Sequence, residues 1–149
     1  MLAYVSMGME RKNEISMAQL SDAARAFLGE VRYGIAATIQ EDGMPHQTVM
    51  WYDLRGDYIM MNTLVGRVKE KNLKRDPRIS LCVEDELRYV TVTGRATLDY
   101  DHNTSQETIK FLATKYNGPE TAERQMRDLF GKQSRVTIYM SIEDVDEHL

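Results

Sequence analysis

The chain has 149 residues, 42% of them hydrophobic and 28% charged, with a net charge of -4. This balance suits one folded domain and excludes a collagen-like or largely disordered protein. No apolar run reaches the roughly 18 residues that a membrane-spanning helix needs. The single cysteine excludes an internal disulfide, and three scattered histidines predict no metal site. We expect a single cytoplasmic domain over residues 1–149.

The first predicted element is an amphipathic helix over residues 15–30, preceded by an N-terminal arm at 1–15. Ser16 and Gln19 have the spacing of a capping box, and Gly29 suits the end of a helix. One stripe of this segment is apolar, which predicts that the helix covers a hydrophobic surface.

Five strand-like runs follow, separated by Gly- and Asp-containing turns. They occupy residues 33–40, 45–54, 57–63, 79–85 and 88–100. Because the connections are short, neighbouring strands are expected to be antiparallel.

Two helices and a sixth strand complete the pattern. Thr104 and Glu107 form a second possible capping box, and Pro119 suits the first turn of the next helix. Residues 134–141 predict a strand, whereas the tail at 142–149 has no strong pattern and is expected to fray or to hold a partner subunit. Six strands with helices near the ends favour a mainly β fold, a small closed antiparallel barrel with flanking helices.

The segment "GRVKEKNLKRDPR", residues 66–78, has six basic and two acidic residues, so it carries +4 while the rest of the chain carries -8. A positive field this local indicates a local anionic partner. Three interpretations compete: a solvated helix, a nucleic-acid surface, or a site for a small phosphate ester. The acidic remainder opposes a polyanion, so we expect no nucleic-acid partner. A strand end that runs directly into a basic helix favours the phosphate ester.

Three segments in register carry a family resemblance: "DGMPHQTVMWY" (42–52), "NTLVGRVKEKNLKRDPR" (62–78) and "YVTVTGRATL" (89–98). Together they resemble the split β-barrel flavin and deazaflavin oxidoreductases, the superfamily of pyridoxamine 5'-phosphate oxidase. The resemblance implies a six-stranded antiparallel split β-barrel and a homodimer with cofactor sites at its interface. The run Asn72 to Arg78 looks most like the branch that uses the deazaflavin coenzyme F420.

The resemblance also implies a cofactor site. It assigns Arg67 and Lys69 to the cofactor phosphate, with Asn62 and Thr63 beside it at a strand end. The strand that flanks the tricyclic ring would supply His46, Gln47, Thr48, Val49, Met50 and Trp51. Met61, Val68 and Asn72 complete the expected cofactor-binding set. Alternate strand residues face opposite ways, so only one half of the ring-flanking set can face the ring directly.

The function implied is an oxidoreductase that transfers a hydride to or from a small organic substrate. Coenzyme F420 is the first choice of cofactor and FMN the second. A cofactor that carries the chemistry explains why the sequence shows no nucleophile–base pair. His46, Tyr89 or solvent could supply a proton, and no catalytic residue is assigned. The alternatives are an FMN-dependent enzyme related to pyridoxamine-phosphate oxidase, a non-catalytic flavin- or deazaflavin-binding protein, and a plain structural or interaction domain.

Overall fold

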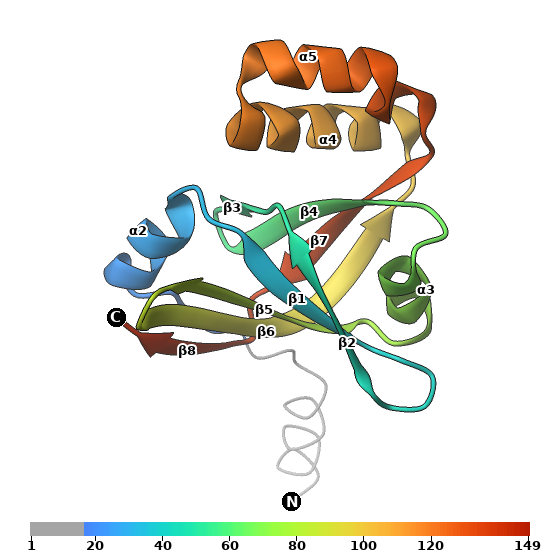
Figure 1. Cartoon of the computed structure of the whole chain (residues 1–149). Helices are drawn as coiled ribbons and strands as arrows, with labels where there is room; N and C mark the ends of the chain where they lie inside the picture. The colour runs from blue at the N-terminus through green and yellow to red at the C-terminus, as the bar shows by residue number, and fades with distance from the viewer. Residues whose placement is uncertain (1–16) are drawn as a thin grey trace, which may run out of the picture.

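A strongly curled antiparallel sheet dominates the computed structural model, which describes residues 17–149 (Figure 1). The strands are β1 (Gly34–Ile39), β2 (Pro45–Met50), β3 (Asp53–Arg55), β4 (Tyr58–Leu64), β5 (Arg78–Asp85), β6 (Arg88–Asp99), β7 (Arg135–Ser141) and β8 (Asp144–His148). The helices are α2 (Asp22–Gly29), α3 (Val68–Arg75), α4 (His102–Asn117), α5 (Pro119–Asp128) and the short 3-10 helix η1 (Phe130–Lys132). The sheet order is β2-β1-β5-β6-β7-β4-β3, with β8 also paired to β6. The mainly β split-barrel fold with flanking helices is confirmed, but with eight strands instead of the expected six.

The long strand β6 joins the two halves of the curled sheet. Its first part pairs with β5, up to Arg78 opposite Arg95, and its last part pairs with β7 from Ala96 onward. At the change of partner, a side chain on Gly94 would lie 1.8 Å from the backbone oxygen of Ser141. Glycine is therefore required here, because only the absence of a Cβ lets the two strands approach this closely.

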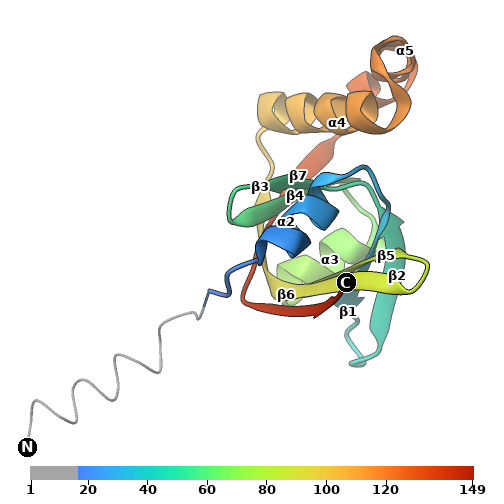
Figure 2. The same ribbon diagram turned by 90° about the vertical axis from the view of Figure 1, so that its left-hand side faces the viewer.

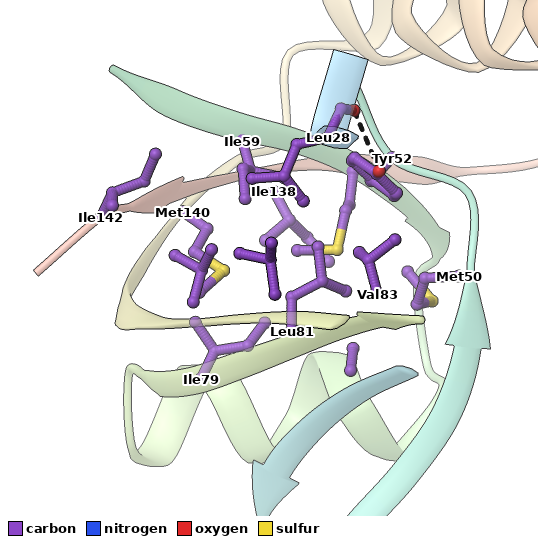
Figure 3. Close-up of a cluster of buried hydrophobic side chains, with 14 of the residues drawn as sticks. Leu28, Met50, Tyr52, Ile59, Ile79, Leu81, Val83, Ile138, Met140 and Ile142 are labelled. Carbon is purple, nitrogen blue, oxygen red and sulfur yellow. Dashed lines mark hydrogen bonds between the residues drawn. The ribbon is translucent and has the colours of Figure 1, made fainter. Parts of the chain in front are cut away.

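The core fills the inside of the curl. Ile59, Leu81 and Met140, from three different strands, are completely buried there (Figure 3). Each side chain of this kind contributes about 1.5–3 kcal/mol when fully buried. The hydroxyl of Tyr52 donates a 2.9 Å hydrogen bond to the Leu28 carbonyl, which ties α2 to the core.

The first helix is shorter than predicted and begins at another cap. Helix α2 starts at Asp22, and the Ser21 hydroxyl accepts a hydrogen bond from the Ala24 N–H. Gln19 precedes the helix, while Ser16 and the expected arm at 1–15 lie outside the described residues. The boundary was wrong because Ser21 satisfies the helix start directly, whereas the earlier capping spacing is only a local sequence match.

The predicted strand at 45–54 is interrupted between Met50 and Asp53. At the break, the Tyr116 hydroxyl accepts from the Tyr52 N–H, and the Lys115 ammonium donates to the Tyr52 carbonyl. Side chains of α4 thus replace sheet partners for the backbone of Tyr52, and the ring of Tyr52 packs in the core. No local sequence pattern signals hydrogen bonds that come from a helix more than sixty residues away.

Helices α4 and α5 form a pair above β3, β4 and β7 (Figure 1 and Figure 2). Helix α4 begins at His102, capped by the carboxylate of Asp101, so the predicted Thr104 cap was wrong: the Thr104 N–H donates to that carboxylate instead. Pro119 occupies the first turn of α5 as predicted. Both features follow ordinary capping preferences.

The C-terminal segment is a strand. Residues 144–148 form β8, which pairs with Tyr89 to Thr93 of β6, so the expectation that 142–149 frays was wrong. A contact of this tail with a partner subunit stays a prediction. The segment "DVDEH" has one apolar residue, Val145, which packs against the core. None of the helices described over residues 17–149 is long and apolar enough to cross a membrane.

Candidate functional site

A cleft of about 390 Å³ lies between the sheet and the α4–η1 region. Its volume is in the range of small-molecule and cofactor sites. Its walls come from β2, β4, the start of α3, α4, η1 and the start of β7. The lining residues are Val49, Met50, Trp51, Asn62, Thr63, Leu64, Arg67, Lys69, Ile109, Leu112, Leu129, Phe130, Gln133 and Arg135.

A sharp turn aims the start of α3 into this cleft. After β4 the Val65 N–H donates to the Ser134 carbonyl, and Gly66 adopts a φ of 95°, which strongly favours glycine. Arg67 follows as the N-cap residue without a side-chain cap hydrogen bond. The turn therefore places Arg67 and Lys69 in the cleft wall, next to the end of β4.

Three cations, Arg67, Lys69 and Arg135, share the cleft without a carboxylate in its lining. Burial, with Arg67 and Arg135 close by, lowers the pKa of Lys69 from its usual value. Burial, and then the charge of Arg67, lower the pKa of Arg135 to about 10. No carboxylate of the described chain lines the cleft to offset the repulsion among these cations. A bound anion would offset it, so the cleft can bind one.

The later cations of the basic segment have ion-pair or hydrogen-bond partners within the protein. Lys74 lies 3.4 Å from the Glu70 carboxylate, and Arg78 lies 2.7 Å from that of Asp76. Arg75 donates to the Ile39 carbonyl. The sequence "GRVKEKNLKRDPR" therefore divides into cleft cations at its start and structurally paired cations at its end.

Aromatic rings form the apolar wall of the cleft. Trp51 stacks on Tyr116, with ring centroids 5.4 Å apart and planes 12° apart, and meets Phe130 edge-on at 6.3 Å. The Tyr116 hydroxyl donates to the Arg32 carbonyl, which anchors the stack. Trp51 is half-buried, so it belongs to the packing and to the cleft surface at once.

Seven of the thirteen expected cofactor-binding residues meet in this cleft: Val49, Met50, Trp51, Asn62, Thr63, Arg67 and Lys69. The other six, His46, Gln47, Thr48, Met61, Val68 and Asn72, do not line it. Met61 is fully buried in the core, and Asn72 donates to the Thr38 hydroxyl under α3. The His46 Nδ1 is enclosed without a hydrogen-bond partner in the described part of the chain.

The second half of the cleft was not identified from the sequence. It comprises Leu64, Ile109, Leu112, Leu129, Phe130, Gln133 and Arg135. Most of these residues follow position 98, where the family-like segments end. One sequence signal was available. Arg135 is a cation at the start of the mostly apolar strand "RVTIYM", and charged residues are rarely placed next to a core.

Neither proton-donor candidate of the sequence analysis lies in the cleft. Tyr89 stacks on His148 with centroids 5.2 Å apart, on the β6–β8 side of the sheet. Over residues 17–149, no group of three or more His, Cys, Asp or Glu residues could hold a metal ion. The cleft can thus bind an anion and an aromatic or apolar group, and its lining has no carboxylate, thiol or imidazole.

Comparisons with known proteins identify a family and a relative. Residues 20–148 match the family model described as pyridoxamine 5'-phosphate oxidase. The chain is 26% identical over 110 residues to the F420H(2)-dependent biliverdin reductase of Mycobacterium tuberculosis, covering 72% of this chain and 80% of the relative.

Two solved structures share the fold. One is a conserved hypothetical protein from Mycobacterium tuberculosis, with a TM-score of 0.73 and 28% identity, covering 90% of this chain and 87% of the other. The second is named as an F420 reductase, with a TM-score of 0.70 and 22% identity, covering 85% of this chain and 98% of the other.

Proposed function

The chain belongs to the pyridoxamine 5'-phosphate oxidase family, and on this premise we propose that it is an oxidoreductase that binds a flavin-type cofactor in the cleft. One observation carries the proposal. Arg67, Lys69 and Arg135 converge without an acidic partner beside a wall formed by Trp51 and Phe130. A phosphate and a flat aromatic ring system have the chemistry that these two parts of the cleft accept.

The residues present fit such a group. Arg67 and Lys69 would hold its phosphate, and the N–H groups at the start of α3 add donors on the same side. The aromatic wall would receive the ring system and exclude water from one of its faces. When bound, the cofactor supplies hydride transfer, so the protein contributes binding, orientation and electrostatics. The cleft lining has no carboxylic acid, thiol or imidazole, which is consistent with a protein whose cofactor carries the chemistry.

Coenzyme F420 is the first choice of cofactor, and FMN is the second. Support for F420 comes from the relative named as an F420H(2)-dependent biliverdin reductase. Support for FMN comes from the cation cluster itself, since Arg67 and Lys69 would hold a terminal phosphate as readily. The substrate would be a small organic molecule, reduced or oxidised at the exposed side of the ring.

Fluorescence titration tests the proposal. Trp51 is the only tryptophan of the chain and lines the cleft, so a bound cofactor ring should quench its emission. We expect saturable quenching by F420 or by FMN, and loss of that quenching in Arg67→Ala but not in Lys71→Ala. Lys71 is the matched control because it lies on the same helix outside the cleft lining. Absence of binding by both cofactors would contradict the proposal.

A non-catalytic role is the second candidate. The cleft lining has no ionisable proton donor other than its cations, which also suits a protein that stores or carries the cofactor. Turnover separates the two roles. The oxidoreductase should consume reduced cofactor when offered a panel of enones, quinones and tetrapyrroles, whereas a carrier should bind it and show no consumption.

We also propose that two copies of the chain form a homodimer. Val49, next to the aromatic wall, is 62% exposed, and Met44 and Tyr33, at opposite ends of the β1–β2 hairpin, are 60% and 58% exposed. A second copy would cover apolar side chains of this hairpin. Light scattering should give twice the mass of the chain at micromolar concentration, and a monomer there would contradict the proposal.

A further inference from the structure

A buried hydrogen-bond network connects the cleft to α4. Asn62 on β4 donates from its Nδ2 to the Ser105 carbonyl and to the Thr108 hydroxyl, each at 2.9 Å. The Thr108 hydroxyl shares a 2.8 Å hydrogen bond with the hydroxyl of Thr137 on β7, and either can donate. All four residues are buried, with Asn62 only 6% exposed. Polar groups at such positions are retained only when their hydrogen bonds are satisfied.

The network fixes the direction in which the Asn62 amide faces. Both of its N–H groups are used, and a flipped amide would place its oxygen against the Ser105 carbonyl. The amide oxygen therefore faces Arg135, whose Nε donates to it at 2.8 Å. The Asn62 side chain has no N–H left for a ligand, so its amide cannot donate to a bound phosphate.

Arg135 is held on three sides by neutral groups. Besides Asn62, the Gln133 side-chain oxygen accepts from its Nη1 at 2.6 Å, and the guanidinium carbon lies 5.0 Å from the centre of the Phe130 ring. A carboxylate at either position would cancel the charge. Amide oxygens orient the guanidinium and leave it positive, with unused N–H groups at the cleft.

The position of Arg135 in the fold explains how it reaches the cations of α3. Leu64, the last residue of β4, pairs with Arg135, the first residue of β7. The next strand pairing on the same face places Asn62 opposite Thr137. Arg135 thus lies where β4 ends and the chain turns into α3, and the charge of Arg67 contributes to the lowered pKa of Arg135.

We infer that Arg135 is a third anion-binding residue of the cleft, and that Asn62 is a positioning residue that acts through Arg135 and does not contact the anion. The inference rests on the proposed function, because it takes the cleft as the site of the cofactor phosphate. The ligand class is a phosphate, which a guanidinium fork recognises through two N–H groups together.

Calorimetric titration with inorganic pyrophosphate tests the inference without any cofactor. Arg135→Gln should weaken pyrophosphate binding by about tenfold or more, as expected for the loss of a charge-assisted contact. Arg135→Lys keeps the charge and should restore part of the affinity. Lys132→Ala, an exposed cation of η1 outside the cleft lining, is the control and should bind as the unchanged protein does.

A double-mutant cycle tests the positioning role of Asn62. Asn62→Ser should weaken pyrophosphate binding in the unchanged background and have no further effect in the Arg135→Gln background. Equal losses in both backgrounds would show that Asn62 contacts the anion itself, and would overturn its assignment. Should Asn62→Ser fail to fold, Thr108→Val removes one anchor of the amide at nearly constant shape, with the same expectation in the two backgrounds.

The outcomes separate the inference from the proposed function. Unchanged pyrophosphate affinity in folded Arg135→Gln, or no pyrophosphate binding by the unchanged protein, overturns the inference. Pyrophosphate binding that depends on Arg135, in a protein that binds neither F420 nor FMN, supports the inference and contradicts the proposed function. Tight cofactor binding that survives Arg135→Gln contradicts the inference and leaves the proposed function standing.

Discussion

The two ends of the basic segment, residues 66–71 and 72–78, each have three basic residues and one acidic residue, but their cations have different roles. At its start, Arg67 and Lys69 face the cleft and have no ion-pair partner within the described chain. At its end, Lys74 and Arg78 pair with Glu70 and Asp76. The difference teaches that charge density in a sequence does not reveal which charges are available to a ligand. Availability depends on whether the fold supplies a carboxylate nearby.

The pKa values reflect the same contrast. Burial, and then neighbouring cations, lower the pKa of Lys69, whereas the Glu70 carboxylate raises the pKa of Lys74. A cation with a lowered pKa is destabilised in its charged form until an anion arrives. A cation with a raised pKa already has its partner, so a ligand has little to gain from it.

The largest expected effect is on cofactor affinity at the start of the segment. Arg67→Ala and Lys69→Ala should each weaken F420 or FMN binding by at least about tenfold, since losing a charge-assisted contact costs about 2–5 kcal/mol. The ligand-free variants should melt at the same Tm or higher, because each substitution relieves repulsion. Fluorescence titration and thermal melting check the two parts. A variant with unchanged affinity would break the contrast between the two ends.

The pH dependence of binding should be the next largest effect. The phosphate needs the cleft cations protonated, and their pKa values are lowered in the ligand-free protein. Affinity should therefore be highest near neutral pH. It should decline as the pH rises past the lowered pKa of Lys69, and decline further as the pH passes about 10, the pKa of Arg135. Titration of pyrophosphate at increasing pH measures this. Binding that stays constant above pH 10 would mean that these groups do not hold the anion.

At the other end of the segment, substitution should affect stability instead of binding. Lys74→Ala leaves the buried carboxylate of Glu70 with the Tyr100 hydroxyl as its remaining partner, so the Tm should fall. Cofactor affinity should stay within about twofold, because the paired charge is remote from the cleft. The double variant Lys74→Ala with Glu70→Gln should recover part of the lost Tm. A large loss of affinity in Lys74→Ala would contradict the division of the segment.

The smallest effect is expected for Lys71, in the middle of the helix. This exposed cation has no ion-pair partner within residues 17–149 and does not line the cleft. Lys71→Ala should change cofactor affinity by less than about twofold at physiological salt, since exposed charges are screened there. Its Tm should stay the same. A stronger effect at low salt than at high salt would indicate long-range attraction of the anion.

The candidate site was predictable on the side where local sequence and register carry the information. The segments at 42–52 and 62–78 contain all seven expected residues that meet in the cleft. These residues lie on short, consecutive elements, a strand end, a glycine turn and a helix start, whose positions local sequence predicts. His46 and Thr48 lie on the same strand as Val49, but the cleft lies only at its far end. The opposite wall was not predictable, because Phe130 and Arg135 reach the cleft only through the packing of α4, η1 and β7.

The sequence by itself determined the antiparallel β fold, most strand positions and the Pro119 helix start, since these follow from residue periodicity and turn chemistry over short stretches. It also determined that residues 66–78 carry an excess of positive charge. Only the tertiary structure decided that Trp51 and Tyr52 leave the strand, that residues 144–148 join the sheet, and that Arg135 completes the cation cluster. Each of these depends on partners far away in the chain, and hydrogen bonds and charges act across space without any periodic signal in the sequence.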